Sequence, residues 1–258
     1  MKILLTGASG FIGSQVLEKF NKTIEFHCID RNLSSHRLKD YERGSIVEGH
    51  DLLTCDLPDV DAVIHLAGSS GVRHSLENPT EYWKNNVIMS QRIFDHYKNT
   101  RILYASSSTA KEPWRNPYAM SKYAMEAIAP PNSLGMRFTT VYGPGAREQM
   151  FIPKLLRDDV SYINVDHIRD FIHIDDLLSA IGCLIVNKIK KRKVIDIGTG
   201  ISHKLIDITS HLNIDIKDKR MGTIFERKDN TAKIGLLTEL GWSAKVDLLD
   251  YLKENYDN

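Results

Sequence analysis

The sequence predicts an α/β protein built on a doubly wound parallel sheet, with a small α/β part at its C-terminal end. Short apolar segments of strand length alternate along the chain with segments of helical periodicity. Such alternation implies parallel strand pairing through right-handed crossovers. A glycine-rich turn joins the first strand to the first helix, and the Tyr-Gly-Pro-Gly break at 142–145 is the best candidate for a domain boundary.

The first strand and helix are predicted within residues 1–20. An apolar run without alternation at 1–5 suits a strand buried on both faces, and Gly7, Gly10 and Gly13 follow it at three-residue spacing. A strand, a glycine turn and a helix N-terminus form the setting in which backbone N–H groups bind a phosphate. We expect Gly7 to make the tight turn, Gly10 to admit a dinucleotide pyrophosphate and Gly13 to allow close packing, as in a Rossmann-type fold.

The second strand, 26–30, ends in Asp30, about 20 residues past the glycines. A carboxylate at this position accepts hydrogen bonds from a ribose 2′-hydroxyl and repels a 2′-phosphate. Asp30 therefore favours NAD over NADP. The neighbouring Arg31 weakens that inference without reversing it.

The later elements follow from the same patterns, and Pro130 and Pro131 should end a helix that begins near Tyr118. We expect strands at 62–67, 102–105, 134–138 and 194–197 and helices at 80–98 and 175–186. His167, His173, Asp175 and Asp176 superficially suggest a metal cluster. Asp175 instead suits a helix N-cap and Asp176 the first helical turn, so we expect no metal site.

Composition argues against several classes of protein. Lys and Arg total 34 against 33 Asp and Glu, so no net charge indicates a nucleic acid or membrane partner. The basic run 188–193 suits a solvated connection, and the three cysteines lack CxxC spacing and suit reduced, buried thiols. The first strand leaves no room for a signal peptide and the apolar stretch 180–186 is too short to span a bilayer, so we expect a cytoplasmic protein.

Tyr118 and Lys122 lie four residues apart on a predicted helix and therefore on one face of it. A free tyrosine has a pKa near 10, and a neighbouring ammonium favours the phenolate. The pair can therefore provide a base near neutral pH. Because this pair follows the glycine motif in the chain, the two motifs together indicate hydride-transfer chemistry.

Together these motifs resemble the extended short-chain dehydrogenase/reductase family, and within it the NAD-dependent nucleotide-sugar epimerases and dehydratases. The resemblance spans essentially the whole chain. The matching segments are 6–13, Asp30, 65–68, 71–79, 86–87, 106–108, 118–122, 137–144, 169–176, 198–200 and 229–242.

The resemblance implies that residues 1–140, joined again by about 165–200, bind NAD and that 141–258 form a small substrate-binding part. It implies catalytic roles for Tyr118, for Lys122, which would also hold the nicotinamide ribose, and for Ser108, which would bind the substrate oxygen. The implied NAD-binding residues are Gly7, Ser9, Gly10, Phe11, Ile12, Gly13, Asp30, Arg31, Asp51, Leu52, Leu66, Ala67, Gly68, Asn86, Ala105, Ser106, Tyr118 and Lys122.

The implied substrate is a nucleotide-diphosphate sugar. Arg169 matches the phosphate-binding arginine of the family, and Arg220 follows a weaker match to a second one. The alternatives are a surface pairing of Arg169 with Asp166 or Asp170 and a plain surface role for Arg220. The implied substrate contacts are Arg73, Ser108, Thr109, Thr140, Arg169 and Arg220.

The residues after Ser108 narrow the implied reaction. Dehydratases of the family place an Asp-Glu pair where this chain has Thr109 and Ala110, and alanine cannot transfer a proton. Glu112 is the nearest remaining carboxylate. We therefore expect 4-epimerisation of a nucleotide sugar through a 4-keto intermediate. A reductase or dehydrogenase of a 4-keto nucleotide sugar and a non-catalytic NAD-binding regulator stay open as alternatives.

Several features depart from the family pattern. The loop between Ser108 and Tyr118 and the segment 153–169 are shorter than usual, and Thr140 replaces an asparagine that usually contacts the diphosphate. The resemblance also implies a homodimer through the helices at 80–98 and 118–129. The early end of the second helix weakens that expectation.

Overall fold

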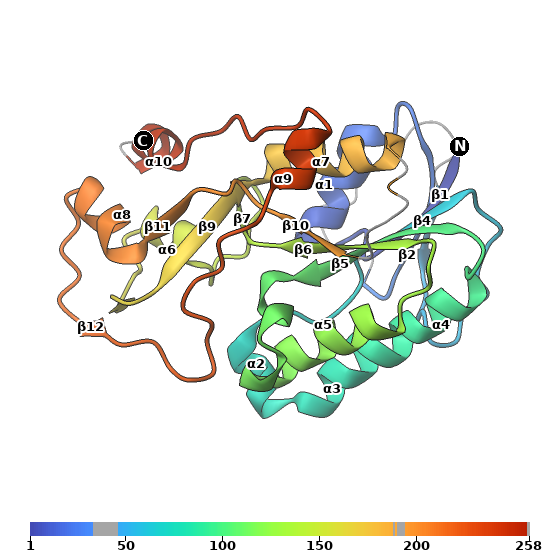
Figure 1. Cartoon of the computed structure of the whole chain (residues 1–258), viewed down its shortest axis with the longest axis horizontal. Coiled ribbons are helices and arrows are strands. Elements are labelled where there is room, and N and C mark those ends of the chain that lie inside the picture. Colours follow the sequence, from blue (N-terminus) through green and yellow to red (C-terminus); the bar gives the residue numbers. More distant parts are fainter. Residues whose placement is uncertain (33–45, 188, 190–193, 257–258) are drawn as a thin grey trace. The chain divides into compact units, whose positions relative to one another are not determined.

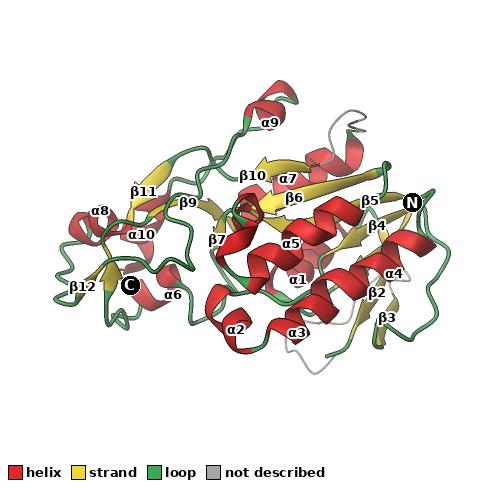
Figure 2. Cartoon of the chain, turned by 60° about the horizontal axis from the view of Figure 1, so that its bottom comes forward, coloured by secondary structure: helices red, strands yellow, loops and turns green. Residues whose placement is uncertain are grey.

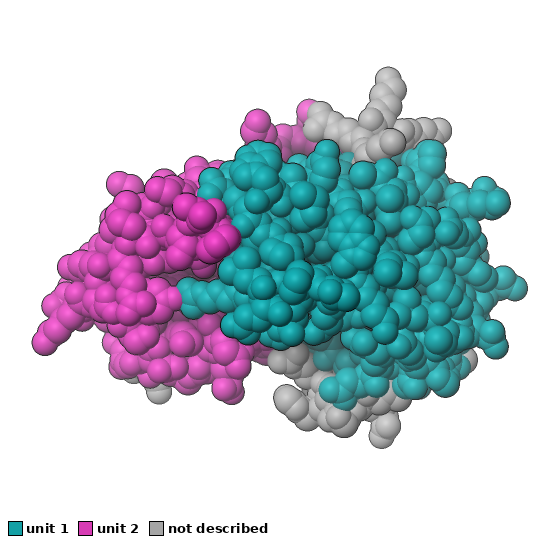
Figure 3. All heavy atoms as spheres, turned by 90° about the horizontal axis from the view of Figure 1, so that it is seen from below, with its two compact units in different colours: residues 1–137, 188–195 teal, residues 138–187, 196–258 magenta. Residues whose placement is uncertain are grey.

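The computed structural model describes residues 1–32, 46–187, 189 and 194–256, so most of the basic run 188–193 lies outside the described residues. Contacts divide the chain into two compact units (Figure 3). Unit 1 comprises Met1–Arg137 with Lys188–Ile195, and unit 2 comprises Phe138–Asn187 with Asp196–Asn258. The first break lies close to the boundary predicted at 140. The segment that returns to unit 1 is shorter than the predicted 165–200.

A seven-stranded sheet with the strand order β10-β6-β5-β4-β1-β2-β3 dominates the fold (Figure 1). The pairs β1–β2, β1–β4, β2–β3 and β4–β5 are all parallel. The strand order reverses at β1, which is the kind of point where ligands bind in open α/β sheets. The predicted fold class is confirmed. The strands are β1 (Lys2–Thr6), β2 (Glu25–Asp30), β3 (Ile46–Gly49), β4 (Ala62–His65), β5 (Arg101–Ser107), β6 (Ser133–Phe138) and β10 (Val194–Ile197).

Within unit 1, helix α1 lies on one face of the sheet and helices α3, α4 and α5 lie on the other (Figures 1 and 2). Apolar side chains of β4 and β5, such as Val63 and Ile102, join one core with Ile93 and Phe94 of α4 and Met125 of α5. The helices are α1 (Phe11–Phe20), α2 (Val72–Glu77), α3 (Pro79–Trp83), α4 (Met89–His96) and α5 (Pro117–Ile128), with short 3-10 turns at Ser108–Lys111 and Pro113–Arg115.

The predicted helix 80–98 is not a continuous α-helix. A π-helical turn, η1 (Lys84–Ile88), separates α3 from α4. Asn85, Asn86 and Val87 are all buried in this turn. Helix α5 ends at Ile128 because Pro130 drives Ala129 into an extended conformation, as predicted.

Unit 2 contains a three-stranded sheet in the order β11-β9-β7 and a parallel pair of β8 with β12. Ile152, Leu155, Phe171, Ile208 and Leu252 share its apolar core. The elements are β7 (Thr140–Tyr142), β8 (Ile163–Asn164), β9 (Ile168–His173), β11 (Ser202–Lys204), β12 (Lys219–Arg220), α6 (Phe151–Leu155), α7 (Ile174–Val186), α8 (Leu205–His211), α9 (Gly235–Glu239) and α10 (Leu248–Tyr256).

One capping prediction is wrong. The N-cap of α7 is His173, whose Nδ1 accepts a hydrogen bond from the Asp175 N–H at 3.2 Å. Asp175 therefore joins Asp176 in the first helical turn, where both carboxylates face the positive end of the helix dipole. No helix among the described residues is long and apolar enough to cross a membrane.

Candidate active site

The turn after β1 leaves no room for a side chain at Gly7 or Gly13. Gly7 has φ +73°, and a Cβ on it would lie 2.7 Å from the backbone nitrogen of Ala67. A Cβ on Gly13 would lie 2.0 Å from the carbonyl oxygen of Gly7. The turn, the first turn of α1 and the loop after β4 therefore meet backbone to backbone, which leaves a cradle lined by main-chain groups.

Helix α1 begins in this cradle. Gly10 is its N-cap residue and supplies no side-chain cap. The N–H groups of the first turn, beginning at Phe11 and Ile12, point out of the helix end and carry the positive end of its dipole. This end of α1 can therefore accept an anionic group of a ligand.

Asp30 ends β2 beside the same turn. Its Oδ2 accepts a hydrogen bond from the Ser9 N–H at 3.0 Å, and its Oδ1 accepts one from the Asn32 N–H at 3.2 Å. The structure thus brings together Ser9 and Asp30, which the resemblance assigns to one ligand. Arg31 is exposed.

The loop after β4, which carries Leu66, Ala67 and Gly68, is held by a buried polar chain that the sequence did not predict. The hydroxyl of Thr6 accepts a hydrogen bond from the Ala67 N–H and lies 2.7 Å from Nδ1 of His65. Nε2 of His65 lies 2.9 Å from the hydroxyl of Ser90. Burial, with a smaller effect of the Lys122 charge, lowers the pKa of His65 to about 3, so the ring stays neutral.

Asn86 joins this loop to the helix that carries Tyr118. Its Oδ1 accepts the Ser69 N–H at 2.8 Å, and its Nδ2 donates to the Ser121 hydroxyl at 2.9 Å. The Ser121 hydroxyl in turn donates to the carbonyl of Tyr118 at 2.8 Å. A Cβ on Gly68 would lie 2.6 Å from Oδ1 of Asn86, so this approach requires glycine.

A second anchor holds the turn that carries Asp51 and Leu52. Arg92 of α4 donates to the carbonyls of Leu52 and Cys55, each at 2.5 Å. The Asp51 carboxylate accepts the Leu53 N–H at 3.0 Å. Arg92 was not predicted from the sequence, because nothing in the order of residues links α4 to a turn 40 positions earlier.

Lys122 is buried on α5, and its Nζ donates to the carbonyl of Ala105 at 2.8 Å. Burial lowers the pKa of Lys122 to about 8, while the carboxylate of Glu126 acts in the opposite direction. Tyr118, one turn earlier, is half-buried and stands edge-on to the ring of Tyr82, with centroids 5.9 Å apart. The two predicted residues therefore lie on one helix, where Tyr118 is partly exposed and Lys122 is buried.

Glu126, one turn after Lys122 on α5, forms an ion pair with Arg137 that the sequence also did not predict. Arg137 donates to both oxygens of Glu126, from Nε at 2.8 Å and from Nη2 at 2.5 Å. The hydroxyl of Ser106 also donates to Glu126. These bonds hold α5 against β5 and β6 at the level of Lys122.

Ser108 and Ala110 are both buried in the 3-10 turn that follows β5. The hydroxyl of Ser107 accepts hydrogen bonds from the backbone N–H of Thr109 at 3.2 Å and from its hydroxyl at 2.9 Å. Glu112 forms an ion pair with Arg115. The carboxylate nearest to Ser108 in sequence is therefore held in a local contact.

The remaining predicted substrate residues are spread over both units. Arg73 is exposed on α2 of unit 1. In unit 2 the hydroxyl of Thr140 accepts a hydrogen bond from Nδ2 of Asn230 at 3.0 Å. Arg220 pairs with Asp218 at 2.5 Å and lies over the ring of Tyr162, 4.2 Å from its centroid.

Arg169 is held by acceptors other than the carboxylates of Asp166 and Asp170. Its Nη1 donates to the carbonyls of Ile168 and Lys228, each at 2.8 Å, and its Nη2 donates to Nδ1 of His167 at 2.9 Å. Burial lowers the pKa of Arg169, which nevertheless stays a cation.

Asp170 instead ties three segments of unit 2 together. Its Oδ1 accepts the N–H and hydroxyl of Thr199, and its Oδ2 accepts the N–H groups of Gly200 and Ala232, all at 2.9 to 3.1 Å. The side chain is completely buried. Because these hydrogen bonds satisfy both oxygens of the buried carboxylate, Asp170 is a structural residue.

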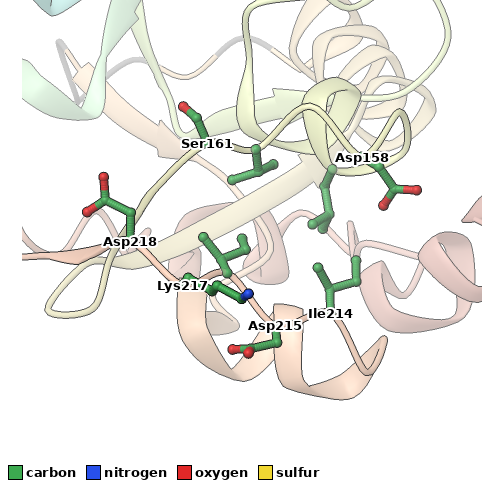
Figure 4. Close-up of a pocket in the computed structure, with 9 residues that line it drawn as sticks. Asp158, Ser161, Ile214, Asp215, Lys217 and Asp218 are labelled. Atoms are coloured by element: carbon green, nitrogen blue, oxygen red, sulfur yellow. The ribbon is translucent and has the colours of Figure 1, made fainter.

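A pocket of about 290 Å³ lies in another part of unit 2 (Figure 4). Two of its acidic residues, Asp215 and Asp218, pair with Lys219 and Arg220. Its lining contains none of the predicted site residues. The lining residues are Leu155, Asp158, Val160, Ser161, Ile214, Asp215, Ile216, Lys217 and Asp218.

Known proteins resemble this chain over most of its length. A 30% identity over 231 residues links it to Protein CapI of Staphylococcus aureus, covering 72% of this chain and 69% of the relative. A UDP-glucose 4-epimerase of Yersinia enterocolitica is 26% identical, covering 98% of this chain and 96% of the relative. That alignment runs over 324 positions, so the relative has segments that this chain of 258 residues lacks.

Solved structures agree with this relationship. MoeE5 in complex with UDP-glucuronic acid and NAD superposes with a TM-score of 0.85 at 25% identity, covering 100% of this chain and 98% of that one. The UDP-glucuronic acid 4-epimerase of Bacillus cereus in complex with UDP-glucuronic acid and NAD gives the same TM-score and coverage at 27% identity. Residues 3–198 match the model of the NAD dependent epimerase/dehydratase family. The chain therefore belongs to the NAD dependent epimerase/dehydratase family.

Proposed function

We propose that this protein interconverts the C4 epimers of a UDP-sugar, with NAD as its cofactor. One observation carries the proposal: Tyr118 and the buried Lys122 share a face of α5, and Asn86 ties that helix to the glycine-lined loops of unit 1. The relatives from Yersinia enterocolitica and Bacillus cereus are named as epimerases of UDP-glucose and UDP-glucuronic acid, which makes these two sugars the first substrates to test.

The cradle fits NAD. The close backbone approach at Gly7 and Gly13 leaves main-chain donors beside the uncapped end of α1, where a pyrophosphate is stabilised. The carboxylate of Asp30 stands at the end of β2, where a ribose hydroxyl can donate to it. NAD held by these groups would supply the acceptor and donor of a hydride for C4 of the sugar.

Tyr118 acts as the base in this proposal. Its phenolate removes the proton of the C4 hydroxyl, the hydroxyl of Ser108 holds the same oxygen, and the ammonium of Lys122 stabilises the phenolate. The 4-keto sugar then presents its other face, and Tyr118 returns the proton as the hydride comes back. Because burial lowers the pKa of Lys122 to about 8, the ammonium is present at neutral pH and is lost in mild alkali.

The described turn after Ser108 offers no acid and base for dehydration. Thr109 is hydrogen-bonded to Ser107 through its hydroxyl and its N–H. Ala110 is buried and has no side-chain group that can donate or accept a proton. Glu112 is engaged by Arg115. Elimination of water needs an acid and a base in fixed positions at the sugar, which argues for epimerisation.

A product analysis tests the reaction. We would incubate the protein with UDP-glucose, UDP-glucuronate and UDP-N-acetylglucosamine and resolve the products by NMR. The expected product is the C4 epimer of at least one substrate, with NAD retained through purification because no net oxidation occurs. A 4-keto-6-deoxy sugar would instead indicate a dehydratase, and turnover that requires added NADH would indicate a reductase.

We also propose that the protein forms a homodimer through α3, η1 and α5. These elements carry four half-exposed apolar side chains, Trp83, Ile88, Met120 and Tyr123, which are 43% to 51% exposed. Exposed apolar residues that cluster on adjacent helices are typical of an interface. Sedimentation equilibrium tests the proposal: a dimer that Trp83→Arg dissociates is expected, and a monomeric wild-type protein would contradict it.

A further inference from the structure

His167 contacts Arg169 and the chain segment that carries Arg220, the two arginines that the resemblance assigns to the substrate diphosphate. It directly precedes β9, and its side chain is 3% exposed. Its backbone is fixed on both sides, because its N–H donates to the Asn164 carbonyl at 3.2 Å and its carbonyl accepts the Leu205 N–H at 3.1 Å. The ring therefore occupies a set position within unit 2.

The contact with Arg169 fixes the tautomer of this ring. Nη2 of Arg169 lies 2.9 Å from Nδ1 of His167. A guanidinium has five N–H donors and no acceptor, so Nδ1 must be the unprotonated nitrogen and the neutral ring carries its proton on Nε2. Among the described residues, the contacts to His167, Ile168 and Lys228 use three of these donors, which leaves N–H groups for an anion.

The other edge of the ring faces the segment that carries Arg220. A Cβ on Gly222 would lie 2.0 Å from Nε2 of His167, so this backbone packs directly on the imidazole. The N–H of Gly222 donates to Asp166 at 2.7 Å, and β12 pairs with β8 so that Arg220 is opposite Asn164. His167 thus touches both chain segments that supply a diphosphate-binding arginine.

We propose that His167 is a positioning residue for the substrate diphosphate: its neutral ring holds Arg169 in place, and its protonation releases that arginine. This inference rests on the proposed function. A protonated ring places an N–H at Nδ1, facing an N–H of Arg169 with the same charge, and two donors cannot hydrogen-bond to each other. Binding of the diphosphate then weakens as the pH falls.

The charges around the ring set this balance. Oε2 of Glu226 lies 3.7 Å from Nε2 and favours the protonated ring, whereas Arg169 opposes it. Asp166 is next in the chain, and its charge is engaged by Lys228 at 2.7 Å. Asn164 of β8 is neutral and approaches Nδ1 at 3.4 Å.

Direct binding of UDP tests the proposal without turnover. Calorimetric affinities would be measured at pH 7.5 and 5.5 for the wild type, for His167→Gln, whose amide oxygen accepts from Arg169 but does not titrate, and for His167→Ala. His211→Gln, at an exposed position at the end of α8, is the matched control. The terminal phosphate of UDP also ionises near pH 6, but this effect is common to all variants and cancels in their ratios.

We expect wild-type affinity to fall about tenfold more than that of His167→Gln between the two pH values, because protonation of the histidine removes its hydrogen bond to the charged Arg169. His167→Ala should bind about tenfold more weakly than wild type at pH 7.5, while His211→Gln follows the wild type. Equal pH dependence in wild type and His167→Gln, or full affinity in a folded His167→Ala, would overturn the inference. If wild type binds no UDP at pH 7.5, the proposed substrate class itself fails, and this inference fails with it.

Discussion

The two units of this protein hold their loops in place by different physical means. In unit 1 the cradle is shaped by missing side chains: Gly7, Gly13 and Gly68 stand where any Cβ would overlap a neighbouring atom. In unit 2 the segments that contain Thr199, Gly200 and Ala232 are held by a side chain that accepts hydrogen bonds from their backbone N–H groups, that of Asp170. The contact of Gly13 with Gly7 joins residues a few positions apart, whereas Asp170 binds residues that only the fold brings together.

The largest expected effect concerns unit 1. Tyr118→Phe removes the proposed base and should lower turnover at least about a thousandfold, or about 4 kcal/mol of barrier, while NAD affinity changes little. Tyr123→Phe is the matched control, because Tyr123 lies on the same helix, directly after Lys122, and is exposed. Initial rates and fluorescence titration of NADH separate the two effects. Retained activity in Tyr118→Phe would remove this tyrosine from the mechanism.

The second prediction compares a glycine of each unit. Gly13→Ala places a methyl group 2.0 Å from the Gly7 oxygen and should cost about 3 kcal/mol in the free energy of unfolding, together with NAD binding. Gly235→Ala in α9 meets nothing within 4 Å and should instead stabilise the protein by up to about 1 kcal/mol. Urea unfolding measures both. Equal effects would contradict the view that contact with the backbone specifies the turn in unit 1.

A third prediction tests the side-chain anchor of unit 2. Asp170→Asn keeps the shape but turns an NH₂ group toward backbone N–H donors, which should cost about 3 kcal/mol because buried donors lose their acceptor. Asp175→Asn, an exposed acid in the first turn of α7, should cost only about 0.5 kcal/mol. Thermal unfolding followed by circular dichroism measures both. A neutral Asp170→Asn would show that the loops of unit 2 do not depend on this carboxylate.

Much of unit 1 could be predicted because its signals are local. The apolar strand, the glycine spacing and the separation of Tyr118 from Lys122 each lie within a few residues of sequence. The fold class follows from the same alternation. The π-helical turn could not be predicted, since one extra residue in a helical turn leaves the apolar pattern of 80–98 almost unchanged.

The hydrogen-bond partners of the predicted residues could not be predicted from the sequence. Arg92 meets Leu52 across 40 positions, and Asn86 meets Ser121 across 35. Arg169 was predicted from its motif, but its acceptor His167 first suggested a metal ligand. A motif names the residues of a site, whereas their hydrogen-bond partners depend on tertiary packing.

Asp170 has a consequence for how the length of such proteins evolves. Its carboxylate connects β9 to residues 29, 30 and 62 positions later in the chain, at Thr199, Gly200 and Ala232. An insertion or deletion between these points changes none of the anchored atoms, and loop closure costs little more as a loop lengthens. Segments can therefore be gained or lost between the anchors without disturbing the contacts of this carboxylate.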